Sequence, residues 1–202
     1  TKKRFLAKVN ADRFADFVTV DANGDWYVSL SDGHGFQTFR PWRTGHGRDS
    51  NDQLMADFDG NGRADAAVYF ANVGRWFVGL SNGVNGFGYP NQWSDGHGLG
   101  SGKRFAGDTN GDSRADAAHF FPGTGVFDIG LASPQGGLWP PTRWATNQGI
   151  GTTEQFIADV DGDGDADLIT FDRSTGNWNV SKADRVKFGM YALWLVGMGK
   201  GS

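Results

Sequence analysis

Short apolar stretches recur along the whole chain, alternate with polar positions and are separated by glycine-rich turns. The first two stretches of each recurring unit fall at 4–7 and 17–20, 53–56 and 66–70, 104–107 and 117–121, and 155–158 and 168–171. Alternation with a period of two residues over four to eight positions is typical of strands, and short turns between such runs are typical of hairpins. The pattern therefore predicts consecutive antiparallel strands and no helix.

Two further strands complete each unit, and aromatic residues mark both. A third strand begins at one set of equivalent positions, Trp26, Trp76, Phe127 and Trp178. A weaker fourth strand ends at another set, Trp42, Trp93, Trp144 and Trp194. Large aromatic side chains at one position of every repeat favour packing between repeats, and we expect this role for the first set.

A period of about 50 residues with four strands per unit is the signature of a β-propeller blade. We predict an all-β fold, a single repeat domain over 1–202, with four blades at approximately 1–48, 49–99, 100–150 and 151–202. The alternative is that the chain forms part of a larger ring of seven or eight blades, completed by further blades or by a second copy.

Composition supports this architecture and narrows the partners. The chain has 32 glycines and 14% aromatic residues, which suits many tight turns around a packed core. The formal net charge is −4, and no basic run indicates nucleic-acid binding. No apolar stretch is long enough to span a bilayer.

The acidic residues are concentrated in a nine-residue loop between the first two strands of each unit. The four copies begin at Lys8, Asp57, Asp108 and Asp159, which lie 49, 51 and 51 positions apart. Oxygen-bearing side chains at loop positions 1, 3, 5 and 9, with a backbone carbonyl at position 7, are ligands suited to Ca²⁺. The spacing therefore predicts calcium sites that clip the hairpins together.

Three of the loops carry the complete pattern. Their predicted ligand residues are Asp57, Asp59, Asn61, Arg63 and Asp65; Asp108, Asn110, Asp112, Arg114 and Asp116; and Asp159, Asp161, Asp163, Asp165 and Asp167. The last loop has the most carboxylates, and we expect it to bind most tightly. In the first loop Lys8 occupies position 1, where its ammonium can pair with Asp12 and Asp16. We predict that this loop holds no metal.

The segment 56–65, Ala-Asp-Phe-Asp-Gly-Asn-Gly-Arg-Ala-Asp, its copies and the hairpins at 81–83 and 85–88 resemble the FG-GAP/VCBS repeat family of calcium-binding β-propellers. The chain is also similar to fungal integrin-like propeller lectins. This resemblance covers all four repeats, where seven are usual. It implies a calcium-binding scaffold that serves as a lectin, an adhesion head or part of a secreted carbohydrate enzyme.

Ligand-binding candidates follow the fourth strand of each unit, in the segment that leads to the next. An aromatic ring can cover the apolar face of a sugar, and neighbouring polar groups can bind its hydroxyls. The residues with this character are Trp42, His46 and Arg48; Trp93, Asp95 and His97; and Trp144 and Gln148. The alternative is that these residues pack between blades or form turns.

Three functions remain open from the sequence. The first is a glycan-binding module of a secreted or extracellular protein. The second is a calcium-stabilised structural or adhesion module that contacts a protein partner or other domains of a parent chain. The third is a polysaccharide lyase or hydrolase, but no asymmetric constellation of catalytic side chains stands out, and we assign no catalytic residue.

Overall fold

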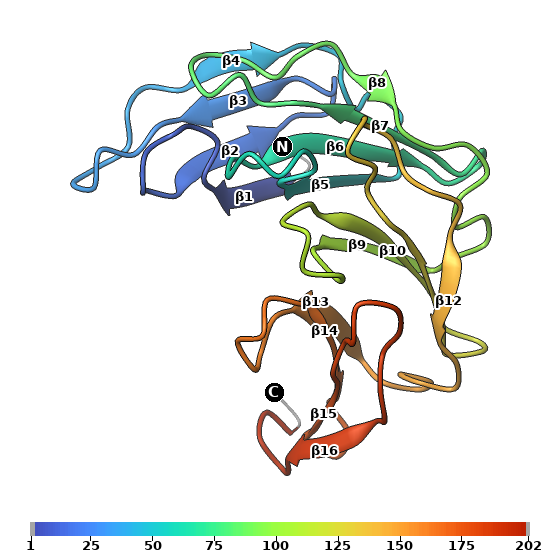
Figure 1. Ribbon diagram of the computed structural model, residues 1–202. Coiled ribbons are helices and arrows are strands. Elements are labelled where there is room, and N and C mark those ends of the chain that lie inside the picture. Colours follow the sequence, from blue (N-terminus) through green and yellow to red (C-terminus); the bar gives the residue numbers. More distant parts are fainter. Residues whose placement is uncertain (1–2, 201–202) are drawn as a thin grey trace. The chain divides into compact units, whose positions relative to one another are not determined.

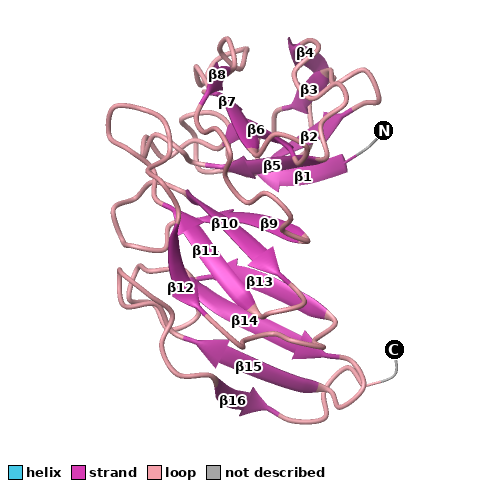
Figure 2. Ribbon diagram, turned by 90° about the vertical axis from the view of Figure 1, so that its right-hand side faces the viewer, coloured by secondary structure: helices cyan, strands magenta, loops and turns pink. Residues whose placement is uncertain are grey.

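The computed structural model describes residues 3–200, which form four separate four-stranded antiparallel sheets and contain no helix (Figures 1 and 2). In every sheet the strands lie side by side in chain order, each paired with the next. The predicted all-β fold of four four-stranded propeller blades is confirmed. The extreme ends of the predicted blades, residues 1–2 and 201–202, lie outside the described residues.

The chain divides into two compact units, each containing two blades. The first unit comprises Thr1–Leu99 together with Ser133–Gly137, and the second comprises Gly100–Ala132 together with Leu138–Ser202. The strands of the first unit are β1 (Lys3–Ala7), β2 (Asp16–Val20), β3 (Trp26–Ser29) and β4 (Arg40–Arg43), then β5 (Asp52–Ala56), β6 (Asp65–Phe70), β7 (Arg75–Gly79) and β8 (Asn91–Gln92).

The strands of the second unit follow the same order. They are β9 (Lys103–Gly107), β10 (Asp116–Phe121), β11 (Val126–Gly130) and β12 (Thr142–Ala145), then β13 (Glu154–Ala158), β14 (Asp167–Asp172), β15 (Asn177–Ser181) and β16 (Ala192–Leu195). In the part of the chain that the structure describes, no helix is long and apolar enough to cross a membrane.

Within each unit, one blade lays an apolar face on the next. In the first unit Val9, Val18, Trp26, Val28 and Trp42 from the β1–β4 blade form one core with residues of the β5–β8 blade, namely Ala66, Val68 and Phe87. The period-two alternation of these strands places such residues on one face, as the sequence pattern requires. The tryptophan at the start of β3 is fully buried there, in the packing role expected of it.

The second unit repeats this core with different side chains. Phe127, Ile129 and Trp144 of the β9–β12 blade pack with Leu168 and other residues of the β13–β16 blade, among them Ala183 and Phe188. Phe127 replaces the tryptophan of the other blades and stacks on Phe120 at 4.5 Å between ring centroids. Burial of large aromatic surface therefore joins the blades in both units.

A buried aspartate ties each acidic loop to its blade. The last loop residue, Asp16, Asp65, Asp116 or Asp167, is fully buried in every repeat. Asp16 shows the arrangement: one carboxylate oxygen accepts a hydrogen bond from Val9 N at 3.1 Å, and the other accepts one from Ser31 N at 2.9 Å. Because Val9 lies in the loop and Ser31 follows β3, one side chain holds three segments together.

Replacing Asp16 tests this connection, because Asp16 lies in the loop that we expect to hold no metal. Asp16→Ala should lower the free energy of unfolding by about 2–4 kcal/mol, since two backbone amides lose their acceptor. Asp16→Asn keeps one oxygen and should lose about half as much. Chemical denaturation of the three proteins measures both effects. Losses below about 0.5 kcal/mol in Asp16→Ala would contradict the interpretation.

Candidate functional site

Two of the acidic loops gather carboxylates closely enough to share one cation. In the second loop Asp57, Asp59 and Asp65 each place an oxygen within 4.8 Å of the others. Asp159, Asp161 and Asp163 do the same in the fourth loop. Hard carboxylate oxygens gathered in this way match the ligand chemistry of Ca²⁺. The donor sets therefore fit the ion that the spacing predicts.

The carboxylate at loop position 1 also shapes the turn. Asp57 accepts hydrogen bonds from Gly60 N at 2.8 Å and Gly62 N at 2.6 Å, and Asp159 accepts the equivalent bond from Gly164 N at 3.1 Å. Gly62 and Gly164 have φ values of 80° and 94°, a left-handed conformation that favours glycine. Glycine at loop position 6 therefore allows both loops to make the same sharp turn.

The first loop is built differently because Lys8 cannot accept these amide hydrogen bonds. Within residues 3–200, no ion pair joins Lys8 to Asp12 or Asp16. A Cβ atom added to Gly62 of the second loop would lie 3.8 Å from Lys8 Nζ. The ammonium group therefore lies beside the neighbouring acidic loop.

The third loop has the same turn, but one of its carboxylates, Asp112, pairs with an arginine of the same loop. Asp108 accepts hydrogen bonds from Asp112 N at 3.1 Å and Ser113 N at 2.7 Å, and Ser113 takes a φ of 69° without being glycine. The Arg114 guanidinium donates to the Asp112 carboxylate. A cation in this loop would compete with Arg114 for Asp112.

The buried aspartate at loop position 9 differs electrostatically from the exposed ones. Burial raises the pKa of Asp65 to about 7 and that of Asp116 to about 6, although each carboxylate accepts backbone hydrogen bonds that act in the opposite direction. A neighbouring cation favours the charged form of a carboxylate. In Asp65 each oxygen accepts one amide and keeps a second lone pair, so Asp65 can serve both the fold and an ion.

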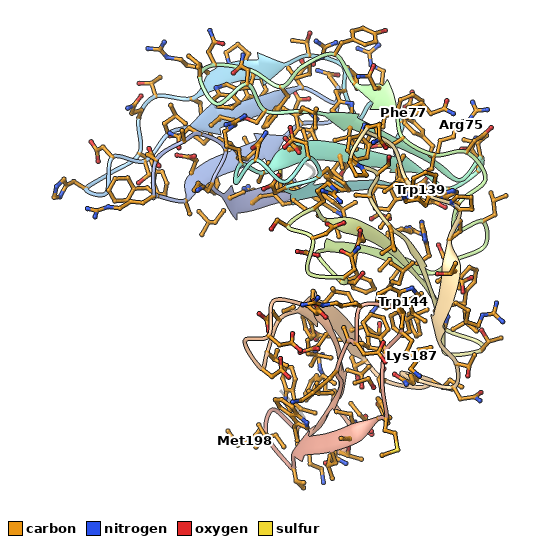
Figure 3. The ribbon with its side chains drawn as sticks, viewed as in Figure 1. Arg75, Phe77, Trp139, Trp144, Lys187 and Met198 are labelled. Carbon is orange, nitrogen blue, oxygen red and sulfur yellow. The ribbon has the colours of Figure 1, made fainter. Side chains whose placement is uncertain are left out.

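The three tryptophans predicted as ligand-binding residues are largely buried and each packs against a phenylalanine. Trp42 contacts Phe87, Trp93 contacts Phe58 and Trp144 contacts Phe188, with ring centroids 5.2, 5.6 and 5.4 Å apart. Figure 3 labels Trp144, which projects from β12. These contacts give the three rings a packing role.

The polar candidates divide into buried and exposed groups. His46 Nε2 donates to the Ala66 carbonyl at 2.9 Å, and burial lowers the pKa of His46, which favours the neutral ring. Burial also lowers the pKa of His97. Gln148 is half-buried and donates to the Gly189 carbonyl at 3.1 Å, across the junction of the two blades in the second unit.

Arg48 and Asp95 are exposed. Arg48 Nε lies 3.5 Å from the Asn23 carbonyl. Asp95 pairs with Arg75 at 2.7 Å, and this hydrogen bond lowers the pKa of the Asp95 carboxyl. Neither Arg48 nor Asp95 lines the cleft described next, whereas His46 does.

A cleft of about 310 Å³ opens between the two blades of the first unit. One wall is the segment after Trp42, and the opposite wall consists of aromatic residues from β6, β7 and the segment before β8. The lining residues with polar or aromatic side chains are Arg43, Thr44, His46, Phe70, Phe77 and Tyr89. Figure 3 labels Phe77 on β7. Phe70 and Phe77 meet edge to face at 5.8 Å between centroids.

Arg43 gives this cleft a polar group that protein atoms do not satisfy. Its guanidinium carbon lies 5.1 Å from the centre of the Tyr89 ring. Its Nε is buried and has no hydrogen-bond partner among residues 3–200. A guanidinium carries five N–H donors, so its terminal nitrogens can still donate to a ligand oxygen. Aromatic surface beside a hydrogen-bond donor is the chemistry that a sugar requires.

A second cleft of about 320 Å³, also in the first unit, is lined by Trp93 and several amide side chains. Asn91 and Gln92 of β8 lie on one side, and Gln135 with its two neighbouring glycines lies on the other. This cleft brings together one predicted residue, Trp93, with three that the sequence analysis did not select. It has fewer aromatic groups than the cleft at Arg43.

Except for His46, the polar and aromatic residues of the Arg43 cleft escaped the sequence analysis, because most of them differ between repeats. Where the β5–β8 blade has Phe70, Phe77 and Tyr89, the β13–β16 blade has three non-aromatic residues at the equivalent positions, Asp172, Asn179 and Met190. The sequence analysis chose candidate residues because they recur at equivalent positions of the repeats. The departures from the repeat were the signal that could have identified this cleft.

Comparison with known proteins finds similarity to solved structures. No family model matches the chain, and no curated protein sequence does. A solved structure that concerns specific recognition of non-reducing terminal N-acetylglucosamine by an Agrocybe aegerita lectin is similar, with 25% identity and a TM-score of 0.74. The match covers 94% of this chain and 51% of the lectin, so this chain spans about half the lectin's length.

A second solved structure, the Photorhabdus luminescens Tc holotoxin pore, matches with 11% identity and a TM-score of 0.47. It covers 98% of this chain and 12% of the toxin chain. At that similarity it bears on neither fold nor function. The lectin match supports the propeller fold described above.

The burial of Trp42 predicts that this residue matters for stability. Trp42→Ala should lower the free energy of unfolding by about 3–5 kcal/mol, because it leaves a cavity against Phe87. Denaturant unfolding measures the loss, and Trp139→Ala, which removes an exposed tryptophan, is the matched control and should cost little. A Trp42→Ala protein as stable as the control would contradict the assigned packing role.

Proposed function

We propose that the chain is a calcium-stabilised carbohydrate-binding module of the integrin-like propeller type, and that it binds a glycan in the Arg43 cleft. The observation that carries this proposal is the Arg43 guanidinium in a cleft beside the Phe70, Phe77 and Tyr89 rings. The similar lectin recognises terminal N-acetylglucosamine, and this supports a saccharide as the ligand class. The proposed ligand is therefore a glycan with an exposed terminal sugar.

In this proposal each wall of the cleft has a distinct role. The exposed Tyr89 and the edge of Phe77 cover the apolar face of the sugar ring, and Arg43 donates to a ring or hydroxyl oxygen. The Thr44 hydroxyl is exposed on the same side as Arg43 and can donate or accept. Burial favours the neutral ring of His46, whose hydrogen bond to the Ala66 carbonyl fixes its orientation, and this ring forms the inner wall.

Calcium has a structural role in this proposal. The second and fourth loops are the proposed calcium sites, because their carboxylates already lie close together. Calcium binding by the third loop stays a prediction, because Arg114 would first have to release Asp112. An ion that binds only the folded state stabilises that state by mass action. Such loops suit a secreted protein, because Ca²⁺ is plentiful outside cells, and we place the protein there.

Glycan binding can be measured by titrating the chain with an N-acetylglucosamine-terminated oligosaccharide after screening a glycan array. Tyr89→Ala and Arg43→Ala should each weaken binding by at least about tenfold, equivalent to about 1.4 kcal/mol. Trp139→Ala, an exposed aromatic outside the cleft, is the control and should bind normally.

The same titration separates the two clefts. Gln92→Ala changes an exposed residue of the Trp93 cleft and should leave affinity unchanged. Loss of binding in Gln92→Ala, with normal binding in Tyr89→Ala, would place the ligand in the Trp93 cleft. No binding to any glycan on the array would refute the proposal and favour a structural or adhesion module.

Calcium binding is tested by thermal unfolding with and without a chelator. At tenfold excess over its dissociation constant, each bound ion should add about 1.4 kcal/mol to the free energy of unfolding. The double variant Asp57→Asn/Asp159→Asn should lose most of this difference, and Asp12→Asn in the first loop should keep it. Identical unfolding with calcium and with chelator would exclude the structural role.

A further inference from the structure

The fourth blade, β13–β16, places a lysine beside its acidic loop, where the other three blades have leucine. Leu30, Leu80 and Leu131 follow the third strand of their blades, and Lys182 occupies the equivalent position after β15. The backbone at this position is similar in these blades. The Lys182 carbonyl accepts a hydrogen bond from Gly189 N at 2.7 Å, and the Leu80 carbonyl accepts the equivalent bond from its own hairpin at 2.7 Å. The fourth blade therefore differs here in its side chain and not in the path of its backbone.

The buried aspartate of the fourth loop brings this position close to the acidic side chains. Asp167 Oδ1 accepts a hydrogen bond from Ala183 N at 2.8 Å, and Asp167 Oδ2 accepts one from Val160 N at 3.1 Å. Because Ala183 directly follows Lys182 and Val160 lies in the fourth loop, these two bonds hold Lys182 at the side of the loop. All four residues belong to one blade, so the arrangement does not depend on any other blade.

The Lys182 ammonium group pairs with one of the carboxylates that lie close enough to share a cation. Lys182 Nζ lies 2.7 Å from Asp161 Oδ2. Asp161 belongs to the cluster with Asp159 and Asp163, in which each residue places an oxygen within 4.8 Å of the others. An ammonium group is a compact positive charge with three hydrogen-bond donors, so it compensates part of the negative charge of this cluster. Lys182 therefore uses a carboxylate that a metal ion would also need.

The second loop has a similar cluster without such a pair. Its three clustered carboxylates accept hydrogen bonds from amide groups, and within residues 3–200 none of them makes an ion pair. Lys8, whose carbonyl accepts a hydrogen bond from Ala64 N at 2.7 Å, lies beside this loop but pairs with none of its carboxylates. The equivalent of Lys182 in this blade is Leu80, which has no charge. The ion pair of Lys182 thus distinguishes the fourth loop from the second.

We propose that Lys182 competes with calcium at the fourth loop, because a calcium ion can use the Asp161 carboxylate only when Lys182 releases it. This inference rests on the calcium binding proposed above and is independent of the glycan proposal. An ion pair exposed to solvent is weak, so the competition lowers the calcium affinity of the loop without abolishing it. It offsets part of the gain expected from the additional carboxylate of this loop, Asp163 in place of Asn61.

Isothermal titration calorimetry with calcium chloride tests the competition on the full chain. Asp57→Asn and Asp108→Asn, introduced together, weaken the second and third loops and leave the fourth loop as the remaining proposed site. In this parent protein, Lys182→Met should bind calcium about three- to fivefold more tightly, because it removes the competing charge and keeps the length of the side chain. Lys182→Gln, a second neutral variant, should show the same gain. Lys182→Arg keeps the charge and should bind no more tightly than the parent.

Lys187→Met is the matched control. Lys187, labelled in Figure 3, belongs to the same blade and lies 4.0 Å from the Asp184 carboxylate, outside the loop. Its replacement should leave the calcium affinity unchanged, and an equal gain in Lys187→Met would overturn the proposal by reducing the effect to net charge. Thermal unfolding midpoints in chelator check that every variant is folded.

The titration also separates this inference from the calcium proposal on which it rests. Calcium binding of equal affinity in the parent, Lys182→Met and Lys182→Gln would overturn the competition and leave the calcium proposal standing. Absence of calcium binding in every protein, the two neutral variants included, would overturn both.

Discussion

One buried carboxylate per repeat is the constraint on which the rest of the structure depends. It joins the acidic loop, the second strand and the segment after the third strand, and it does so through backbone amides. An ionisable group without such partners would be costly to bury. With these backbone amides as donors, the buried aspartate is satisfied inside the apolar core of each blade. The other acidic residues of the loop lie on its exposed side.

The fold was largely predictable from sequence because its determinants repeat. The positions of Trp26, Trp76, Phe127 and Trp178, and of the four acidic loops, fix the strand pattern without reference to distant contacts. The Arg43 cleft was not predictable in this way. It depends on two blades meeting, on Phe77 and Tyr89 standing where another repeat has residues that are not aromatic, and on the burial of Trp42, which its neighbours in space decide.

The same reasoning explains why tryptophan was a weak guide to binding. A large ring near a glycine-rich turn can either face solvent or fill a junction, and its place in the repeat is the same in both cases. Trp42 and Trp144 fill junctions, whereas Trp194 has the same local sequence position and lies exposed. Whether the tryptophan is buried depends on whether another blade packs against it. Its exposure therefore cannot be derived from one repeat alone.

The junction between blades relies on main-chain donors and acceptors, such as Phe87 N with the Trp42 carbonyl and Ala64 N with the Lys8 carbonyl. Main-chain atoms are the same whatever the side chain, so a duplicated or exchanged blade arrives with much of its docking chemistry intact. Side chains at the cleft are correspondingly free to diverge. A lineage can therefore vary what each junction recognises without rebuilding the contacts that keep successive blades together.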